Sequence, residues 1–319
     1  MKKIDQELNF QAAADLIEKA GSVVLVSHEF TDADDLGAAL ALEMVLSSYG
    51  KRTRVVARGG VPDGLMFLPG VEKVTPTPPE ENFDLIIFLG CGELKRHGFK
   101  NWDVAGKPIL NIDHHVDNQK YGQVNLVDAR AAATCEIVYR FIKFLKHPLT
   151  KPVAFNLLAG IFYDTGGFRH ASTSAEVLEI AAELVRTGAR IDRISSYYFG
   201  NNELCKLKAW AKALENIRVD EKQKMIYSVV TEEELAEIGA KPEHLEGIAE
   251  ILNTVPEAKF SLFLKQRGDE IRASLRSENY KGVDVSAIAR TFGGGGHKLA
   301  AGFKLKGKIE KTANGWKIT

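Results

Sequence analysis

The sequence has little cysteine, no long apolar run and no excess of charge of either sign. Its three cysteines, Cys91, Cys135 and Cys205, are odd in number and widely spaced, which argues against a disulfide framework and a cysteine zinc site. No apolar stretch has the length of a membrane-spanning helix. The 42 basic and 42 acidic residues balance, so the chain lacks the positive field that collects long nucleic acid. We therefore expect a soluble, cytoplasmic protein, with neither a membrane nor duplex DNA as a partner.

The residues that are present are typical of a globular protein with more than one domain. The 319 residues are 45% hydrophobic and 26% charged, enough to bury a substantial core. Short, apolar, β-branched runs alternate with helical periodicity in the first half. We expect strands near 22–27, 53–57, 84–90 and 107–113, and helices near 7–19, 35–49, 132–146, 152–162 and 174–187. This alternation predicts an α/β fold with a doubly wound, mainly parallel sheet.

The second half has a different pattern and predicts a smaller α+β domain with antiparallel strands. A helix is expected from Glu203, strands near 225–230, 259–266 and 270–277, and helical stretches near 232–252 and 284–292. We place the first domain at 1–190, a linker at 191–205 and the second domain at 206–319.

Polar side chains follow the apolar runs of the first half. They are His28, Asp32 and Asp34 after the first run, Asp113, His114 and His115 after the run at 107–113, and Asp164 after an apolar helical segment. Ligands of open parallel sheets bind beyond the carboxyl ends of the strands. Carboxylates together with imidazoles suit manganese, iron, zinc or cobalt. Two such ions about 4 Å apart can activate water and stabilise a phosphoryl group, so phosphoester hydrolysis is the leading reaction class.

Each of these features also has a plain structural explanation. The DADD segment could cap the following helix, an aspartate before glycine often marks a turn, and paired histidines can simply lie on the surface. Such explanations become harder to sustain when carboxylates and imidazoles recur at successive strand ends.

A second group of residues, in the last quarter of the chain, suggests an anion-binding surface. Gly293, Gly294, Gly295 and Gly296 allow close approach of the backbone to an anion, and the segment after them has the pattern of a helix start, whose amides could face phosphate. His297 can add a donor, and the strand residue Arg276 can bind phosphate through two nitrogens. A flexible turn and an exposed strand arginine are the alternative.

These motifs together resemble the DHH/DHHA1 phosphoesterases, especially the NrnA-like oligoribonucleases and adenosine-bisphosphate phosphatases. The resemblance extends over nearly the whole chain, through SHEFTDADDLGAALAL, IDHHVDN, YDTGGFRH, SLRS and FGGGGHKLAAG. It implies two Mn²⁺ ions held by His28, Asp32, Asp34, His114 and Asp164. It also implies a supporting role for Asp113, contact of His115 with the scissile phosphate, and nucleotide binding by Arg276, Gly293–Gly296 and His297. A homodimer is plausible on the same ground.

The chain departs from the family pattern at the residue that should bridge the two ions. The family has an aspartate at the end of the third apolar run, where this chain has Gly90 in LGCGELKRHG. Two dications about 4 Å apart repel by roughly 17 kcal/mol at an effective dielectric constant near 20, which a bridging carboxylate partly offsets. Glu93 and Asp35 are carboxylates nearby in sequence, but neither occupies the bridging position. We therefore expect weak binding of one ion, and a gain of at least about a hundredfold in hydrolysis from Gly90→Asp.

The first motif departs as well, with Thr31, Asp35 and Ala38 where the family usually has proline, a small residue and serine. The leading hypothesis is a metal-dependent phosphoesterase acting on short oligoribonucleotides, linear dinucleotides or adenosine 3',5'-bisphosphate. The alternatives are a nucleotide-binding homologue that has lost catalysis, an inactivated variant, and an inorganic pyrophosphatase.

Overall fold

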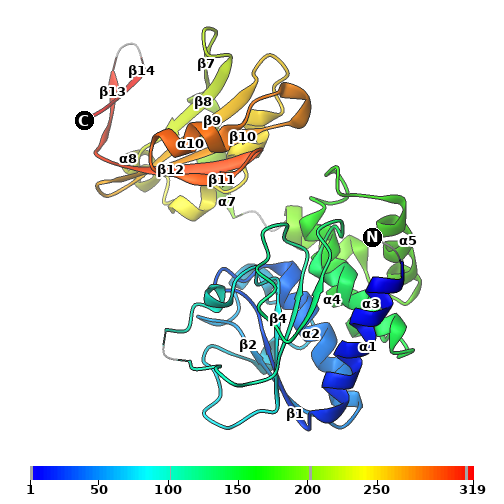
Figure 1. Cartoon of the computed structure of the whole chain (residues 1–319). Coiled ribbons are helices and arrows are strands. Elements are labelled where there is room, and N and C mark those ends of the chain that lie inside the picture. Colours follow the sequence, from blue (N-terminus) through cyan, green and yellow to red (C-terminus); the bar gives the residue numbers. More distant parts are fainter. Residues whose placement is uncertain (1–2, 101, 201–202, 313–314) are drawn as a thin grey trace. The chain divides into compact units, whose positions relative to one another are not determined.

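The computed structural model describes residues 3–100, 102–200, 203–312 and 315–319 (Figure 1). The chain forms two compact units, residues 1–201 and 202–319, and each is described by itself.

The first unit is built on a six-stranded sheet in which all the neighbouring strands are parallel. The strand order is β3-β2-β1-β4-β5-β6. The strands are β1 (Ser22–Val26), β2 (Arg52–Val56), β3 (Val74–Thr75), β4 (Leu85–Leu89), β5 (Ile109–Asp113) and β6 (Val124–Val127). The predicted α/β fold with a parallel sheet is confirmed. The order reverses direction between β1 and β4, which is the place where open α/β sheets bind ligands.

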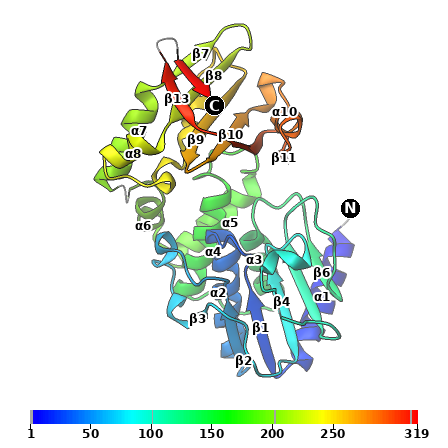
Figure 2. The same ribbon diagram turned by 90° about the vertical axis from the view of Figure 1, so that its left-hand side faces the viewer.

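The two faces of this sheet are covered differently. One face packs against α1 (Lys3–Lys19), α2 (Ala33–Ser48), α3 (Thr134–Phe144), α4 (Lys151–Asp164) and α5 (Ala175–Arg186), which together bury the largest hydrophobic core (Figure 2). The other face is covered by the β4–β5 connection, whose short 3-10 turn (Leu94–His97) and aromatic residues pack on Phe88. The connection is long enough to wrap the sheet without a full helix.

Helices α2 and α4 approach each other closely at two glycines. A Cβ on Gly37 would lie 2.6 Å from the Asn156 carbonyl oxygen, and a Cβ on Gly160 would lie 2.9 Å from Asp34 Cα. Because neither glycine has a side chain, the backbone of α4 lies directly against the first turn of α2. This contact fixes the position of Asp34, a residue of the candidate site.

The second unit contains a mixed sheet of order β11-β12-β10-β9-β8-β7, in which β8 and β9 are parallel and the other pairs antiparallel. Its strands are β7 (Arg218–Asp220), β8 (Met225–Val230), β9 (Phe260–Arg267), β10 (Glu270–Ser277), β11 (Gly295–His297) and β12 (Ala300–Lys306), and β13 (Ile309–Thr312) pairs with β14 (Gly315–Ile318). Its helices are α7 (Leu204–Glu215), α8 (Glu232–Glu237), α9 (Ile248–Asn253) and α10 (Val285–Thr291). Between α5 and α7 lie α6 (Ile191–Ser195) and a π-helical turn (Ser196–Gly200).

Two local expectations are refined or corrected by the structure. The helical stretch near 232–252 is broken into α8, a 3-10 turn (Pro242–Leu245) and α9, because Gly239 and Gly247 have φ of 65° and 90°. The segment after the glycine run is not a helix start; it forms the β11–β12 hairpin.

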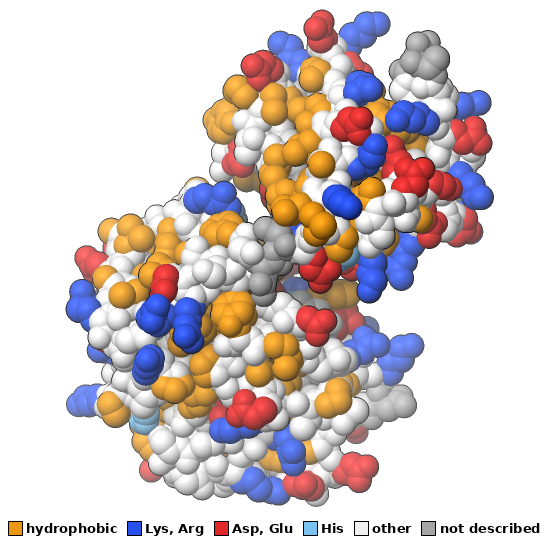
Figure 3. Space-filling view, turned by 180° about the vertical axis from the view of Figure 1, so that it is seen from behind, with side chains coloured by type: hydrophobic (Ala, Val, Ile, Leu, Met, Phe, Trp, Pro, Cys, Tyr) orange, Lys and Arg blue, Asp and Glu red, His pale blue; other side chains and the backbone are white. Residues whose placement is uncertain are grey.

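No helix within the described part of the chain is long and apolar enough to cross a membrane. Basic and acidic side chains are interspersed over the face of the molecule in Figure 3, consistent with the balanced charge of the sequence.

Candidate functional site

The predicted site residues of the first unit lie at the carboxyl ends of β1 and β5, on either side of β4, and at the start of α2. Strands β1, β4 and β5 are neighbours in the sheet, so residues that follow them reach the same edge. Helix α4 brings Asp164 to this edge at its last residue. Two groups of possible metal ligands result, each with ligand atoms within 4.8 Å of one another.

The first group consists of His28, Asp32 and Asp35. Asp32 caps α2 by accepting from the backbone N–H groups of Asp34 and Asp35, while Asp35 Oδ1 accepts from the Asp32 N–H at 2.8 Å. This reciprocal capping box fixes both carboxylates. His28 Nε2 lies 3.6 Å from Asp32 Oδ2 and 3.8 Å from Asp35 Oδ2.

The second group consists of Asp34, His114 and Asp164. Asp34 accepts from the N–H groups of Thr134 at 2.7 Å and Cys135 at 2.8 Å, which holds its carboxylate at the amino end of α3. His114 Nε2 lies 3.0 Å from Asp164 Oδ2 and 3.9 Å from Asp34 Oδ2. Three segments far apart in sequence therefore converge on one point.

Negative charge is concentrated across the two groups. Burial raises the pKa of Asp164 to about 7, and the charge of Asp34 adds to the effect. Burial also raises the pKa of Asp34 and that of Asp35. Burial opposes ionisation of His114, but its bond to Asp164 and the charge of Asp34 raise its pKa to about 9. Burial likewise opposes ionisation of Asp32, yet hydrogen bonds with His28 and Asp35 lower its pKa to about 2. A bound cation would relieve this crowding of carboxylates.

The donor atoms of both groups fit a divalent cation, the second group better than the first. His114 Nδ1 lies 3.3 Å from the Ala131 carbonyl oxygen, and a proton on Nδ1 leaves the Nε2 lone pair facing the carboxylates, as in ligating histidines. His28 Nδ1 instead accepts from the Phe30 N–H at 3.1 Å. Ligation through His28 Nε2 therefore requires Nδ1 to gain a proton and to give up this bond. The second group is the tighter candidate site.

Asp113 organises the two histidines that follow it. Its buried carboxylate accepts from the backbone N–H groups of His114 at 2.8 Å and His115 at 3.2 Å. It also accepts from His115 Nδ1 at 2.6 Å, and this bond raises the pKa of His115. Nε2 of His115, a side chain that is 30% exposed, remains for other contacts.

Gly90 and Glu93 lie at the end of β4. Gly90 has φ of 64°, and its hydrogen-bonded neighbour in the sheet is Ile112. Glu93 is exposed and accepts from Gln119 Nε2, and it belongs to neither ligand group. The structure gives no support to Glu93 as a substitute ligand.

In the second unit, Arg276 and His297 lie on either side of a small residue. Arg276 in β10 and His297 in β11 both pair with Ala300 in the intervening strand β12. Residues paired across antiparallel strands share a face of the sheet, at about 5 Å per step. The next row along the same face is Ser274, Gly302 and Gly295. We call these six residues the small-residue platform.

The four glycines have separate structural roles. Gly293 and Gly294 end α10, since their N–H groups donate to the carbonyls of Arg290 and Ala289. Gly296 permits close approach of β11 to β12, because a Cβ there would lie 2.6 Å from the Ala300 carbonyl oxygen. The run therefore shapes the edge of the platform and does not begin a helix.

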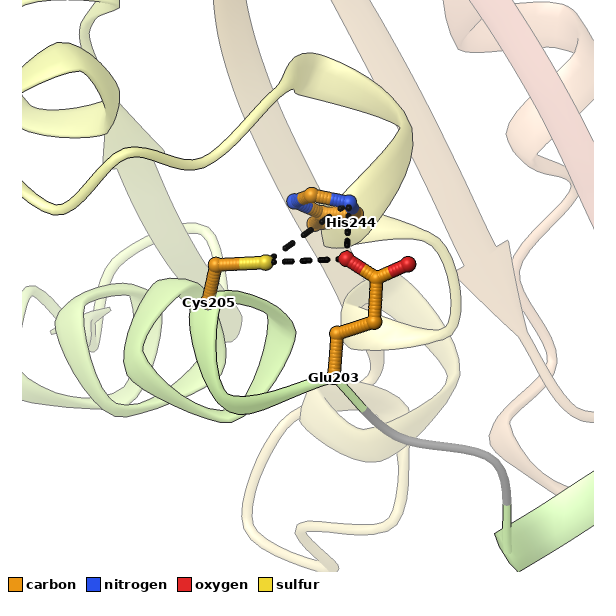
Figure 4. Close-up of side chains that lie close together, drawn as sticks. All are labelled: Glu203, Cys205 and His244. Carbon is orange, nitrogen blue, oxygen red and sulfur yellow. Dashed lines mark hydrogen bonds and ion pairs between the residues drawn. The ribbon is translucent and has the colours of Figure 1, made fainter.

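A third group of possible ligands, Glu203, Cys205 and His244, lies in the second unit (Figure 4). Cys205 Sγ lies 3.1 Å from Glu203 Oε2 and 4.0 Å from His244 Nε2. His244 Nδ1 accepts from the Lys241 N–H, and the carboxylate of Glu203 raises the pKa of the thiol. Glu203 is also largely exposed. These three side chains join the start of α7 to the turn at Pro242–Leu245.

The sequence predicts five of the six possible ligands in the first unit and treats Asp35 only as a nearby carboxylate outside the bridging position. Asp35 stands directly after Asp34 in the chain. The signal in the sequence is that the family pattern usually has a small residue at this position. The group Glu203, Cys205 and His244 was also missed, because His244 is remote from the other two in sequence.

Comparison with known proteins gives matches over both units. Residues 22–161 match the DHH family, N-terminal domain, and residues 222–314 match the DHHA1 domain. A Thermus thermophilus protein named bifunctional oligoribonuclease and PAP phosphatase NrnA is 31% identical over 90% of this chain and 85% of its own. A Streptococcus mutans protein named as a probable enzyme of that kind is 26% identical over 90% of each chain. An exopolyphosphatase-related protein of Bacteroides fragilis superposes with a TM-score of 0.87 at 25% identity, covering 94% of this chain and 92% of its own.

Proposed function

Because this chain belongs to the DHH family, with a DHHA1 domain after the DHH domain, we propose that it hydrolyses phosphoesters of short oligoribonucleotides, linear dinucleotides or adenosine 3',5'-bisphosphate, aided by Mn²⁺. The observation that carries the proposal is the pair of carboxylate–imidazole groups at the carboxyl edge of the parallel sheet. Their oxygen and nitrogen donors suit manganese and contain no thiolate. The name of the Thermus thermophilus relative supports the choice of substrates.

The candidate ligands of the first unit would hold two separate metal ions. Asp34, His114 and Asp164 would hold one ion, and His28 and Asp32 would be ligands of the other. Bound divalent ions supply activation of a water molecule and stabilisation of charge on the phosphoryl and leaving oxygens.

His115 is the side chain proposed to contact the phosphate. Asp113 fixes the ring through Nδ1, so Nε2 can donate to a phosphoryl oxygen. The raised pKa of His115 favours the charged form, which is the better donor.

The small-residue platform is the proposed nucleotide-binding surface of the second unit. Arg276 and His297 offer donors to phosphate at its borders, and the glycines and alanine between them allow a ligand to approach the backbone. Arg276 Nε donates to Glu250 at 2.8 Å, which steadies the guanidinium in the free protein.

A second candidate function is nucleotide binding without hydrolysis. Gly90 favours it, since this residue lacks the carboxylate that the family pattern places between the two ions. The platform would be retained in such a protein, while turnover would be lost.

The test is hydrolysis by the purified full chain in Mn²⁺ of three compounds: a labelled diribonucleotide, adenosine 3',5'-bisphosphate and inorganic pyrophosphate. We expect mononucleotides from the first and AMP with phosphate from the second. His114→Asn should abolish turnover, because it removes a ligand of the tighter group. Asp84→Asn is the matched control, a carboxylate at the opposite end of the sheet.

The other outcomes separate the alternatives. Cleavage of pyrophosphate alone would favour a pyrophosphatase. Binding of the diribonucleotide in equilibrium dialysis, with cleavage of none of the three compounds, would favour the second candidate function.

A further inference from the structure

Asp35 and a side chain at position 90 would compete for the same place. A Cβ built on Gly90 lies 3.0 Å from Asp35 Cβ and 3.7 Å from His28 Cδ2. The first separation is tighter than nearly all real Cβ contacts, and the φ of 64° adds strain for any residue but glycine. The Cβ of Asp35 therefore occupies space that the Cβ of a residue-90 side chain would need, and the Asp35 carboxylate lies 3.8 Å from His28 Nε2.

Asp35 has acceptor capacity left for a ligand. Its Oδ1 accepts from the N–H groups of Asp32 at 2.8 Å and Leu36 at 2.9 Å. Its Oδ2 accepts from the His28 N–H at 2.8 Å. A carboxylate offers about four lone-pair positions, so one remains, on Oδ2. This is also the oxygen that lies 3.8 Å from His28 Nε2. The capping box and the Leu36 N–H hold Oδ1, and the single His28 N–H holds Oδ2.

An independent observation at the same place is the hydroxyl of Thr134. Thr134 is fully buried, and its Oγ1 has no hydrogen-bond partner among the described residues. Oγ1 lies 3.8 Å from the Cβ built on Gly90. A buried hydroxyl without a partner is unfavourable, so we expect a polar group to bind close to the position of the residue-90 Cβ.

We propose that Asp35 is the third ligand of the ion held by His28 and Asp32, in place of the aspartate that the family pattern puts at position 90. The sequence departs from the family pattern at two positions, with an acidic residue at 35 and a glycine at 90. In this proposal the carboxylate ligand has moved from position 90 to position 35. Asp35 belongs to the first group only, so it does not join the two ions as a bridging carboxylate would. This inference rests on the proposed function for the presence of metal.

The test uses the full chain with Mn²⁺ alone and measures bound manganese per chain by equilibrium dialysis, together with the urea midpoint. The variants are Asp35→Asn, Gly90→Asp and the double variant Asp35→Ala/Gly90→Asp. Asparagine keeps the volume and one acceptor oxygen of Asp35. The control is Asp84→Ala, because Asp84 also accepts three hydrogen bonds, from Gly21 and Ser22, at the opposite ends of β1 and β4.

The wild-type chain should bind two manganese ions, one more weakly, and Asp35→Asn should lose the weaker one. Gly90→Asp alone should gain no manganese and should lower the urea midpoint. The double variant should bind two ions and unfold at higher urea than Gly90→Asp. Asp84→Ala should lower the midpoint without loss of manganese.

Three results would overturn the inference: a wild-type chain that binds fewer than two ions, full binding by Asp35→Asn, or a gain of manganese by Gly90→Asp with an unchanged midpoint. If Asp35→Asn does not fold, the double variant provides the test. A double variant whose midpoint of urea unfolding is no higher than that of Gly90→Asp also contradicts the proposal. A wild-type chain that binds two ions and hydrolyses nothing would contradict the proposed function alone.

Discussion

A methyl group on Gly160 would clash with Asp34, a candidate metal ligand. A Cβ at this position would overlap Cys135 Sγ and lie 2.9 Å from Asp34 Cα and 3.0 Å from Asp34 Oδ1. Gly160 lies in the middle of α4, so the backbone cannot move away without disturbing the packing of α2 on α4. We therefore expect Gly160→Ala to lower both the stability of the chain and its affinity for manganese.

The magnitude follows from the kind of contact. Overpacking of a well-packed interior costs about 1–3 kcal/mol. With a slope of about 2 kcal/mol per molar urea, the midpoint should fall by about 0.5–1.5 M. Displacement of Asp34 from His114 and Asp164 should weaken manganese binding by about 10- to 100-fold, the scale seen when the groups that orient a ligand are disturbed.

The assay combines urea unfolding with manganese titration, and Gly64→Ala is the control because a Cβ on Gly64 meets nothing within 4 Å. Adding Cys135→Ala to Gly160→Ala removes the sulfur contact and leaves the Asp34 contact. The double variant should thus recover part of the stability and none of the affinity, measured as a double-mutant cycle. Equal midpoints and affinities for Gly160→Ala and Gly64→Ala would refute the close packing of α2 on α4.

Three further changes test other parts of the molecule. Burial lowers the pKa of His97, so the unfolded chain binds a proton that the folded chain does not, and the free energy of unfolding should fall as the pH drops below about 6.5. The variant His97→Gln should reduce the difference between the midpoints of urea unfolding at pH 7.5 and pH 5.5. If the difference is not reduced, other groups cause the pH dependence. Lys281 Nζ donates to the carbonyls of Asn253 and Val255, so Lys281→Met should destabilise the second unit by about 1–3 kcal/mol in urea unfolding, and a neutral result would mean that these carbonyls find other donors. Ser174 caps α5 through the Val177 N–H, so Ser174→Ala should cost about 1 kcal/mol while the exposed neighbour Ser172→Ala should not, and equal effects would contradict the cap.

The fold of the first unit could be predicted because its central strands β1, β4 and β5 are buried on both faces. Runs such as SVVLV and LIIFL are continuous, apolar and short, which distinguishes strands of a parallel sheet from helices. The two-residue strand β3 and the partly buried β6 were not anticipated, since they lack such a run. In the second unit, the prediction of a helix start after the glycine run is wrong, because close backbone approach is needed equally by an anion and by a neighbouring strand.

The candidate site could be predicted as a set of residues but not as two groups. Strand ends identify which residues reach the edge of the sheet, and this is enough to name His28, Asp32, Asp34, His114 and Asp164. Which of them lie in the same group depends on the N–H groups that donate to each carboxylate. Asp34 is turned away from Asp32 because Thr134 and Cys135 donate to it from α3, and no local pattern links these segments.

Gly90 shows how the structure changes the direction of an expectation. From the sequence, Gly90→Asp restores a missing carboxylate at a strand end and should raise hydrolysis at least about a hundredfold. That reasoning treats the region beyond the strand as open. The Cβ of Asp35 lies only 3.0 Å from the position that a Cβ at residue 90 would take, and three backbone N–H groups fix the Asp35 carboxylate. An aspartate at 90 would therefore add a negative charge and a steric contact to a place that already has a carboxylate. We expect Gly90→Asp to increase hydrolysis only when Asp35 is also replaced by a small residue, because the two side chains would compete for the same space.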